Sequence, residues 1–118
     1  MRCLAVIGVL VAAGLLAGAG PAGNPARVQV VEKEFTITLS RLRVPAGTTI
    51  VEVVNFGMDS HDLVMQSNAK GAKPIVFAQM TPGGRQTKTL RLPAGRYTLW
   101  CSLPGHRAQG MVAPLRVG

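Results

Sequence analysis

An all-β domain, a sandwich or a barrel, is predicted for this chain of 118 residues. Two observations lead to the prediction. Apolar side chains recur at every second position after residue 26, which is the period of a half-buried strand and not that of a helix. Turns rich in proline and glycine separate these stretches at roughly even intervals. The length fits one domain, and no internal repeat or heptad pattern accompanies it.

Each expected strand lies between two such turns. The stretch around Val28 and Val30 alternates, residues 35–39 alternate cleanly, and residues 48–56 are rich in β-branched side chains after the turn at Pro45-Ala46-Gly47. The expected strands are residues 28–32, 35–39, 48–56, 61–66, 85–92, 96–101 and 111–117. Residues 67–80 follow neither period, so a short helix or an irregular excursion is expected there.

The first residues have the features of an export signal. Met1-Arg2 is a short positive start, residues 3–19 are almost wholly apolar, and Ala17-Gly18-Ala19 offers the small residues of a cleavage site. The apolar run is short for a membrane span, which needs about 20 residues. We therefore expect a signal peptide over residues 1–19, a flexible linker over residues 20–26 and the domain over residues 27–118, with a retained membrane anchor as the alternative. The protein is expected in the periplasm or another extracytoplasmic compartment.

The chain is strongly basic, with a formal net charge of +8 from 13 Lys and Arg against 5 Asp and Glu. The simplest interpretation is a well-solvated surface on a monomer. The functional alternative is attraction to an acidic partner or to an anionic membrane face. A nucleic-acid partner is not expected, because the basic residues are scattered and aromatic residues are few.

Residues with metal-binding chemistry gather in the C-terminal quarter. Cys101, His106 and Met111 follow one another at five-residue intervals, with the turn Pro104-Gly105 between the first two. A thiolate, an imidazole and a thioether form a soft donor set that suits copper. His61 is the only other histidine, and it would complete a trigonal site of two histidines and one cysteine with a weak axial methionine.

Each of these residues also has a simpler structural explanation. A lone cysteine is often a small buried apolar residue, a lone methionine often fills a core, and a lone histidine often lies at the surface. After cleavage of the signal, however, Cys101 would be the only cysteine and His61 and His106 the only histidines. Their joint fit to one ligand pattern favours a metal site.

Three sequence motifs resemble the blue-copper cupredoxins. They are the loop C-x₄-H-x₄-M, the preceding strand G-x-Y-x-L-x-C and the upstream segment N-F-G-x₃-H, and the loop spacing is most similar to the auracyanin and sulfocyanin kinds, within a family that also includes plastocyanin. The resemblance covers about residues 27–118. It implies a Greek-key β-sandwich of about eight strands with one type 1 copper ion at one end. It also implies single-electron transfer between protein partners, with His61, Cys101 and His106 as equatorial ligands and Met111 as the axial ligand.

Departures from the family pattern are few. Asp62 stands where many relatives have Asn or Ser, and Leu99 where Phe or Tyr is common. Gly105 takes the place of the second cysteine that a binuclear copper centre needs. No histidine flanks Cys101, as one would in multicopper oxidases and copper nitrite reductases.

Because Trp100 and Ser102 flank Cys101 and no histidine is left over for a catalytic copper, an enzyme is not expected. The alternative function is a periplasmic copper carrier or chaperone that delivers the metal, and the remaining alternative is a sandwich without metal.

We also expect a hydrogen bond between Asp62 and Ser102, an enclosed His61 ring and an exposed edge on His106.

Overall fold

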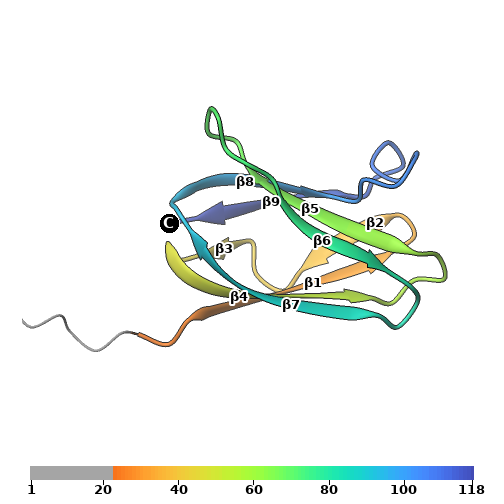
Figure 1. Cartoon of the computed structure of the whole chain (residues 1–118), viewed down its shortest axis with the longest axis horizontal. Helices are drawn as coiled ribbons and strands as arrows, with labels where there is room; N and C mark the ends of the chain where they lie inside the picture. The colour runs from red at the N-terminus through yellow and green to blue at the C-terminus, as the bar shows by residue number, and fades with distance from the viewer. Residues whose placement is uncertain (1–22) are drawn as a thin grey trace, which may run out of the picture.

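Nine strands in two sheets build residues 23–118, which are the residues that this computed structural model describes (Figure 1). The strands are β1 (Ala26–Lys33), β2 (Thr36–Leu39), β3 (Arg43–Val44), β4 (Gly47–Asn55), β5 (His61–Ser67), β6 (Ile75–Met80), β7 (Arg85–Leu92), β8 (Gly95–Trp100) and β9 (Val112–Val117). The all-β prediction is confirmed. The expected signal peptide lies outside the described residues.

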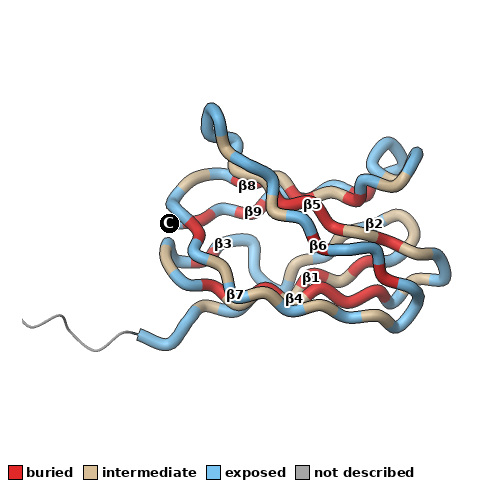
Figure 2. The backbone as a smooth tube through the Cα atoms, in the orientation of Figure 1, coloured by how far each residue is buried: buried red, intermediate tan, exposed pale blue. Residues whose placement is uncertain are grey.

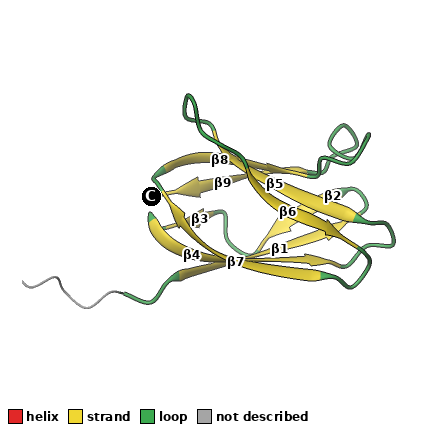
Figure 3. Cartoon of the chain, viewed as in Figure 1, coloured by secondary structure: helices red, strands yellow, loops and turns green. Residues whose placement is uncertain are grey.

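The two sheets face each other as a Greek-key sandwich (Figure 3). One sheet has the order β2-β1-β4-β7 and the other the order β3-β9-β8-β5-β6. The pairs β1–β4 and β3–β9 are parallel and the remaining pairs are antiparallel. Within residues 23–118 no helix is long and apolar enough to cross a bilayer.

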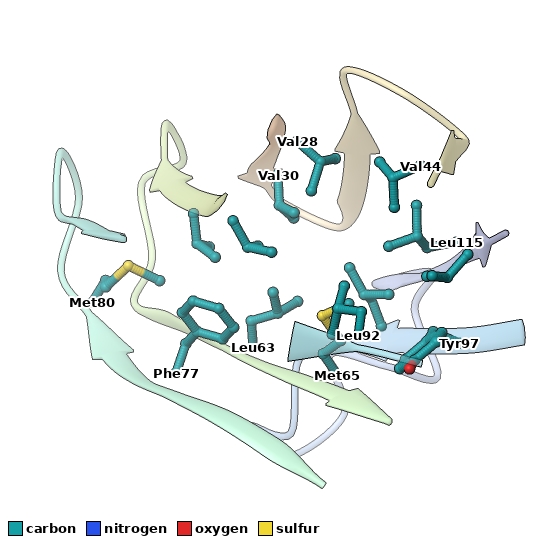
Figure 4. Packing of buried hydrophobic residues seen from close by; sticks show 14 residues of the cluster. Val28, Val30, Val44, Leu63, Met65, Phe77, Met80, Leu92, Tyr97 and Leu115 are labelled. Atoms are coloured by element: carbon teal, nitrogen blue, oxygen red, sulfur yellow. The ribbon is translucent and has the colours of Figure 1, made fainter. Parts of the chain in front are cut away.

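The core is formed by alternate residues of the strands, as the period of two predicts. On β1 the buried side chains are Val28, Val30 and Glu32, and on β8 they are Tyr97 and Leu99. The buried positions line the inner faces of both sheets (Figure 2). Valines from one sheet pack there against larger side chains from the other (Figure 4). The inward direction expected of Tyr97 and Leu99 is confirmed.

Three details differ from the sequence-based expectation. Residues 75–80 form the edge strand β6 and not a helix; its exposed Ala78 and Gln79 obscure the alternation that marks a strand. The two-residue strand β3 is too short to show any period. Strand β1 begins at Ala26, inside the expected linker, and the count is nine strands where about eight were expected.

The two ends of the sandwich carry different parts of the chain. The β1–β2 turn, the β4–β5 loop and the β8–β9 loop gather at one end, at the right in Figure 1. The start of β1, the strand β3 and the C-terminus of β9 lie at the other end. The expected ligands all belong to the first end, because His61 begins β5 while Cys101 directly follows β8.

Candidate metal centre

His61 and Cys101 are brought together by the pairing of two adjacent strands. Strands β5 and β8 run antiparallel, with Val64 opposite Trp100, so the start of β5 lies beside the end of β8. Both side chains are fully buried. The sheet itself therefore fixes the thiol and one imidazole, before the following loop adds further donors.

The β8–β9 loop returns His106 to the same point. The Cys101 amide donates to the Met111 carbonyl at 3.2 Å, and the Met111 amide donates to the His106 carbonyl at 3.2 Å. Gly105 and Gly110 have φ angles of 78° and 123°, which side chains other than glycine rarely tolerate. These contacts close the base of the loop.

Three donor atoms converge at this end. The His61 and His106 Nδ1 atoms lie 3.1 Å apart, and the Cys101 Sγ atom lies 3.5 Å from His106 Nδ1 and 4.0 Å from His61 Nδ1. A metal bound by nitrogen at about 2.0 Å and by thiolate at about 2.3 Å would separate its donors by roughly 3.3 to 3.7 Å. The observed spacing fits such an ion, and the soft nitrogen and sulfur set fits copper.

The backbone of Met111 is hydrogen-bonded to Cys101 and His106, and its side chain is fully buried. It directly precedes β9, and both its amide and its carbonyl belong to the hydrogen bonds at the base of the loop. Its burial suits a thioether that reaches inward. The assignment of the Met111 sulfur as the axial ligand stays a prediction.

Glu34 is a candidate site residue that the sequence did not reveal. It lies in the β1–β2 turn, and its Oε1 atom accepts a hydrogen bond from His61 Nε2 at 2.8 Å. The same carboxylate accepts the amides of Met58 at 2.9 Å and Asp59 at 2.7 Å. These backbone bonds, with the smaller effect of the His61 bond, lower the Glu34 pKa from 4.5 to about 2.

The Glu34 contact decides the tautomer of His61. A carboxylate accepts only, so His61 Nε2 carries a proton, and in the neutral ring Nδ1 then presents its lone pair to Cys101 and His106. A carboxylate that orients a histidine in this way is a common partner of metal-binding imidazoles. No signal could have found it, because Glu34 precedes His61 by 27 residues in an ordinary polar turn.

The N-F-G segment has a structural purpose here. Asn55 is fully buried, and its side-chain amide donates to the carbonyls of Asp59 at 2.8 Å and Met80 at 3.0 Å. A side chain at Gly57 would place its Cβ only 2.3 Å from Glu34 Oε1. Asn55 therefore shapes the loop before His61, and Gly57 leaves room for the carboxylate.

The predicted bond between Asp62 and Ser102 is confirmed. The Ser102 hydroxyl donates to one Asp62 oxygen, and the Ser102 amide donates to the other at 2.6 Å. This contact ties the segment of His61 to the segment of Cys101. Burial raises the pKa of the Cys101 thiol, and the Asp62 charge adds to the increase. A bound cation would favour the thiolate at this position.

The two histidines differ in exposure, as predicted. His61 is fully buried, whereas His106 is half-buried and lies in the loop. The ring of Phe35, also from the β1–β2 turn, meets His106 edge-on with centroids 5.2 Å apart. On the far side of the loop the Arg107 guanidinium lies 4.6 Å from the centre of the Trp100 ring. His106 is thus the ligand candidate that a partner protein could approach.

Residues 26–118 match the model of a family described as copper binding proteins, plastocyanin/azurin family. No curated protein sequence matches the chain.

The fold is similar to that of several solved copper proteins. Reduced auracyanin from Roseiflexus castenholzii is 19% identical with a TM-score of 0.64, over 81% of this chain and 99% of auracyanin. Rusticyanin is 21% identical with a TM-score of 0.61, over 82% of this chain and 80% of rusticyanin. The copper nitrite reductase of Thermus scotoductus is 16% identical with a TM-score of 0.58, over 81% of this chain but only 31% of the reductase. At sequence identities this low, the TM-scores establish a shared fold and nothing more.

Proposed function

Because the chain belongs to the plastocyanin/azurin family of copper-binding proteins, we propose that it is an exported carrier of single electrons between redox partners. Copper is its cofactor, and His61, Cys101, His106 and Met111 are the proposed ligands. The observation that carries the proposal is the convergence of one thiol and two imidazole donors within 4.8 Å of one another at one end of a rigid sandwich.

Copper held by these residues would supply a one-electron couple between redox partners. The residues of the chain would keep the donors in one arrangement during electron transfer. His61 is held from behind by Glu34, and Cys101 is held between β8 and the closed base of the loop. A fixed donor arrangement keeps the rearrangement on electron transfer small.

The distribution of histidines supports a carrier and not an enzyme. The sequence has two histidines, and both belong to this site. A catalytic copper would need further imidazole ligands beside Cys101, where Trp100 and Ser102 stand. The sequence holds no third histidine for such a copper ion.

The burial of the donors favours electron transfer over copper delivery. Cys101 and His61 have no exposed surface, so a metal held by them would leave slowly. Met58, at 87% exposure, is the accessible soft side chain near this end, and a single thioether is a weak site for handing over copper.

The half-buried edge of His106 is the proposed exit for the electron. A shallow hollow in the same loop is lined mainly by small and apolar residues, together with Trp100 and Arg107, and His106 lies outside it. The small and apolar residues include Leu103, Pro104, Ala108 and Val112. A modest apolar surface with few charges suits a redox partner that binds through a small interface and leaves quickly. An acidic partner would be attracted by the net charge of +8 of the chain, with an association rate that falls as salt is added.

The visible spectrum tests the proposal. Addition of Cu(II) to the metal-free protein is expected to give an intense band from charge transfer between the thiolate and copper. Cys101→Ser is expected to abolish the band, because a hydroxyl cannot act as that donor, while Ser102→Ala serves as the neighbouring control that keeps it. A colourless copper complex of the unaltered chain would refute the proposal. Rapid loss of copper to a metal-free acceptor, with no electron exchange, would favour delivery.

A further inference from the structure

Three arginines lie side by side on the outer face of the five-stranded sheet, at the end remote from the copper site. Arg43 on β3 is the register partner of Arg116 on β9, and Arg116 is in turn the partner of Arg96 on β8. All three are exposed. Neighbouring strands are about 4.8 Å apart, so the three side chains leave the sheet within roughly 10 Å. We call Arg43, Arg116 and Arg96 the arginine row.

The row has no compensating acidic side chain. The two ion pairs found within residues 23–118 are His61–Glu34 and Arg85–Glu52, and neither involves the row. Within residues 23–118 the side chains of the row make one hydrogen bond, the donation from Arg43 Nε to the Gly118 oxygen at 2.7 Å. Like charges directly opposite one another weaken a sheet. The fold therefore keeps an arrangement that it does not need for its stability.

Acidic residues are gathered at the other end of the molecule. Of the five in the chain, four surround the copper end, and Glu52 lies midway along β4, where it pairs with Arg85. The four at the copper end are Glu32, Glu34, Asp59 and Asp62. Glu32 is buried, and Lys33, Arg85 and Arg107 lie at the copper end as well, so that end carries charges of both signs. Within residues 23–118 no acidic side chain lies beside the arginine row.

Further basic and apolar groups extend this surface. Arg41 lines one hollow with Arg27 and another with Arg43, so the positive surface continues around the end of the sandwich. Leu42 is 70% exposed, and its carbonyl accepts the Arg116 amide at 3.0 Å, which places the leucine beside the row. Cationic side chains next to an exposed leucine are the combination that binds the interface of an anionic bilayer.

We propose that the arginine row and Leu42 bind the surface of an anionic lipid membrane. The chain enters the domain at this same end, at Ala26, after an apolar stretch over residues 3–19 and a short connection. Contact between this end and lipid would direct the copper site away from the membrane. Cys101 follows Arg96 by five strand residues, which is about 17 Å. The bound domain would present His106 to a soluble partner.

Flotation with lipid vesicles tests the proposal on the full, copper-loaded chain. Vesicles of phosphatidylcholine are compared with vesicles of phosphatidylcholine mixed with phosphatidylglycerol, at low and at high salt. The apolar segment can bind both kinds, so the excess on anionic vesicles measures the contribution of the domain. We expect Arg96→Ser/Arg116→Ser to lower the partition coefficient on anionic vesicles about tenfold at low salt, and to change binding to neutral vesicles little.

A matched double variant separates the row from net charge alone. Lys33→Ser/Arg85→Ser removes the same charge at the copper end of the other sheet. This variant is expected to keep most of the additional binding to anionic vesicles. Equal losses in the two double variants would overturn the proposal, as would equal binding of the unaltered chain to both kinds of vesicle. The proposal would also be wrong if Arg96→Ser/Arg116→Ser kept its binding to anionic vesicles but lost salt-dependent electron exchange with an acidic redox protein. The row would then bind a protein partner and not lipid. The copper spectrum and the melting temperature confirm that each variant is folded, independently of the proposed electron transfer.

Discussion

Glu32 gives the sharpest test of how this fold depends on pH. It is fully buried on the inner face of β1, and neither of its carboxylate oxygens has a hydrogen-bond partner. Its register partners are Asn55 on β4 and Ile37 on β2, and neither donates to it. Burial raises the Glu32 pKa from 4.5 to about 8, and the nearby negative charge of Asp62 adds to the increase.

The direction of the pH effect follows from the raised pKa. Between about pH 4.5 and pH 8 the unfolded chain releases the Glu32 proton while the native protein keeps it. The native state then binds more protons, so stability falls as the pH rises, by about 1.4 kcal/mol per pH unit. From about pH 5.5 to pH 7.5 this one group is expected to lower the free energy of unfolding by about 2.5 kcal/mol.

Urea unfolding of the metal-free protein across this pH range measures the effect. Glu32→Gln should remove about 2.5 kcal/mol of pH dependence, and Glu32→Leu should also remove the cost of burying a polar group without a partner. Glu52→Gln, at a carboxylate whose pKa is lowered by its Gln29 bond and its Arg85 neighbour, is the control that keeps the pH dependence due to Glu32. Parallel pH profiles for the unaltered protein and Glu32→Gln would refute the reasoning.

Three further substitutions address the metal site. Met111→Gln is expected to keep copper bound and to lower its reduction potential, because a harder oxygen donor favours Cu(II); voltammetry measures this, and an unchanged potential would argue against an axial Met111. Glu34→Gln removes the negative charge behind His61 and should raise the potential while the visible band is retained; a fall in potential would contradict this role. Asp62→Ala removes both bonds to Ser102 and should speed the loss of copper to a chelator, whereas an unchanged rate would show that the tie does not hold the site.

Local patterns were sufficient for most of the fold. The alternation along residues 28–32 and 48–56 survives in β1 and β4 because one face of each strand packs on the core and the other is more exposed. The edge strand β6 was not predicted because this alternation is missing there: the consecutive residues Ala78 and Gln79 are both exposed. The turns at proline and glycine were recognisable because their backbone demands are local.

The proposed ligands could also be identified from the sequence, because the donor chemistry is rare and its spacing is regular. Cys101, His106 and Met111 share one loop, and His61 was the only remaining histidine. The sequence by itself thus determined a β-sandwich with a soft-metal site at the end of a strand. It also determined the bond between Asp62 and Ser102, whose positions follow directly from those of two ligands.

Only the tertiary structure decided which distant groups act on that site and on the surface. Glu34 reaches His61 from a turn 27 residues earlier, and Glu32 loses every partner only when the two sheets close over it. The row of Arg43, Arg116 and Arg96 depends on the register of three strands from separate parts of the chain. Alternation and turns depend on neighbouring residues, so the sequence shows them directly. A contact between loops or a register between strands depends on packing across the whole domain, and no local sequence pattern predicts it.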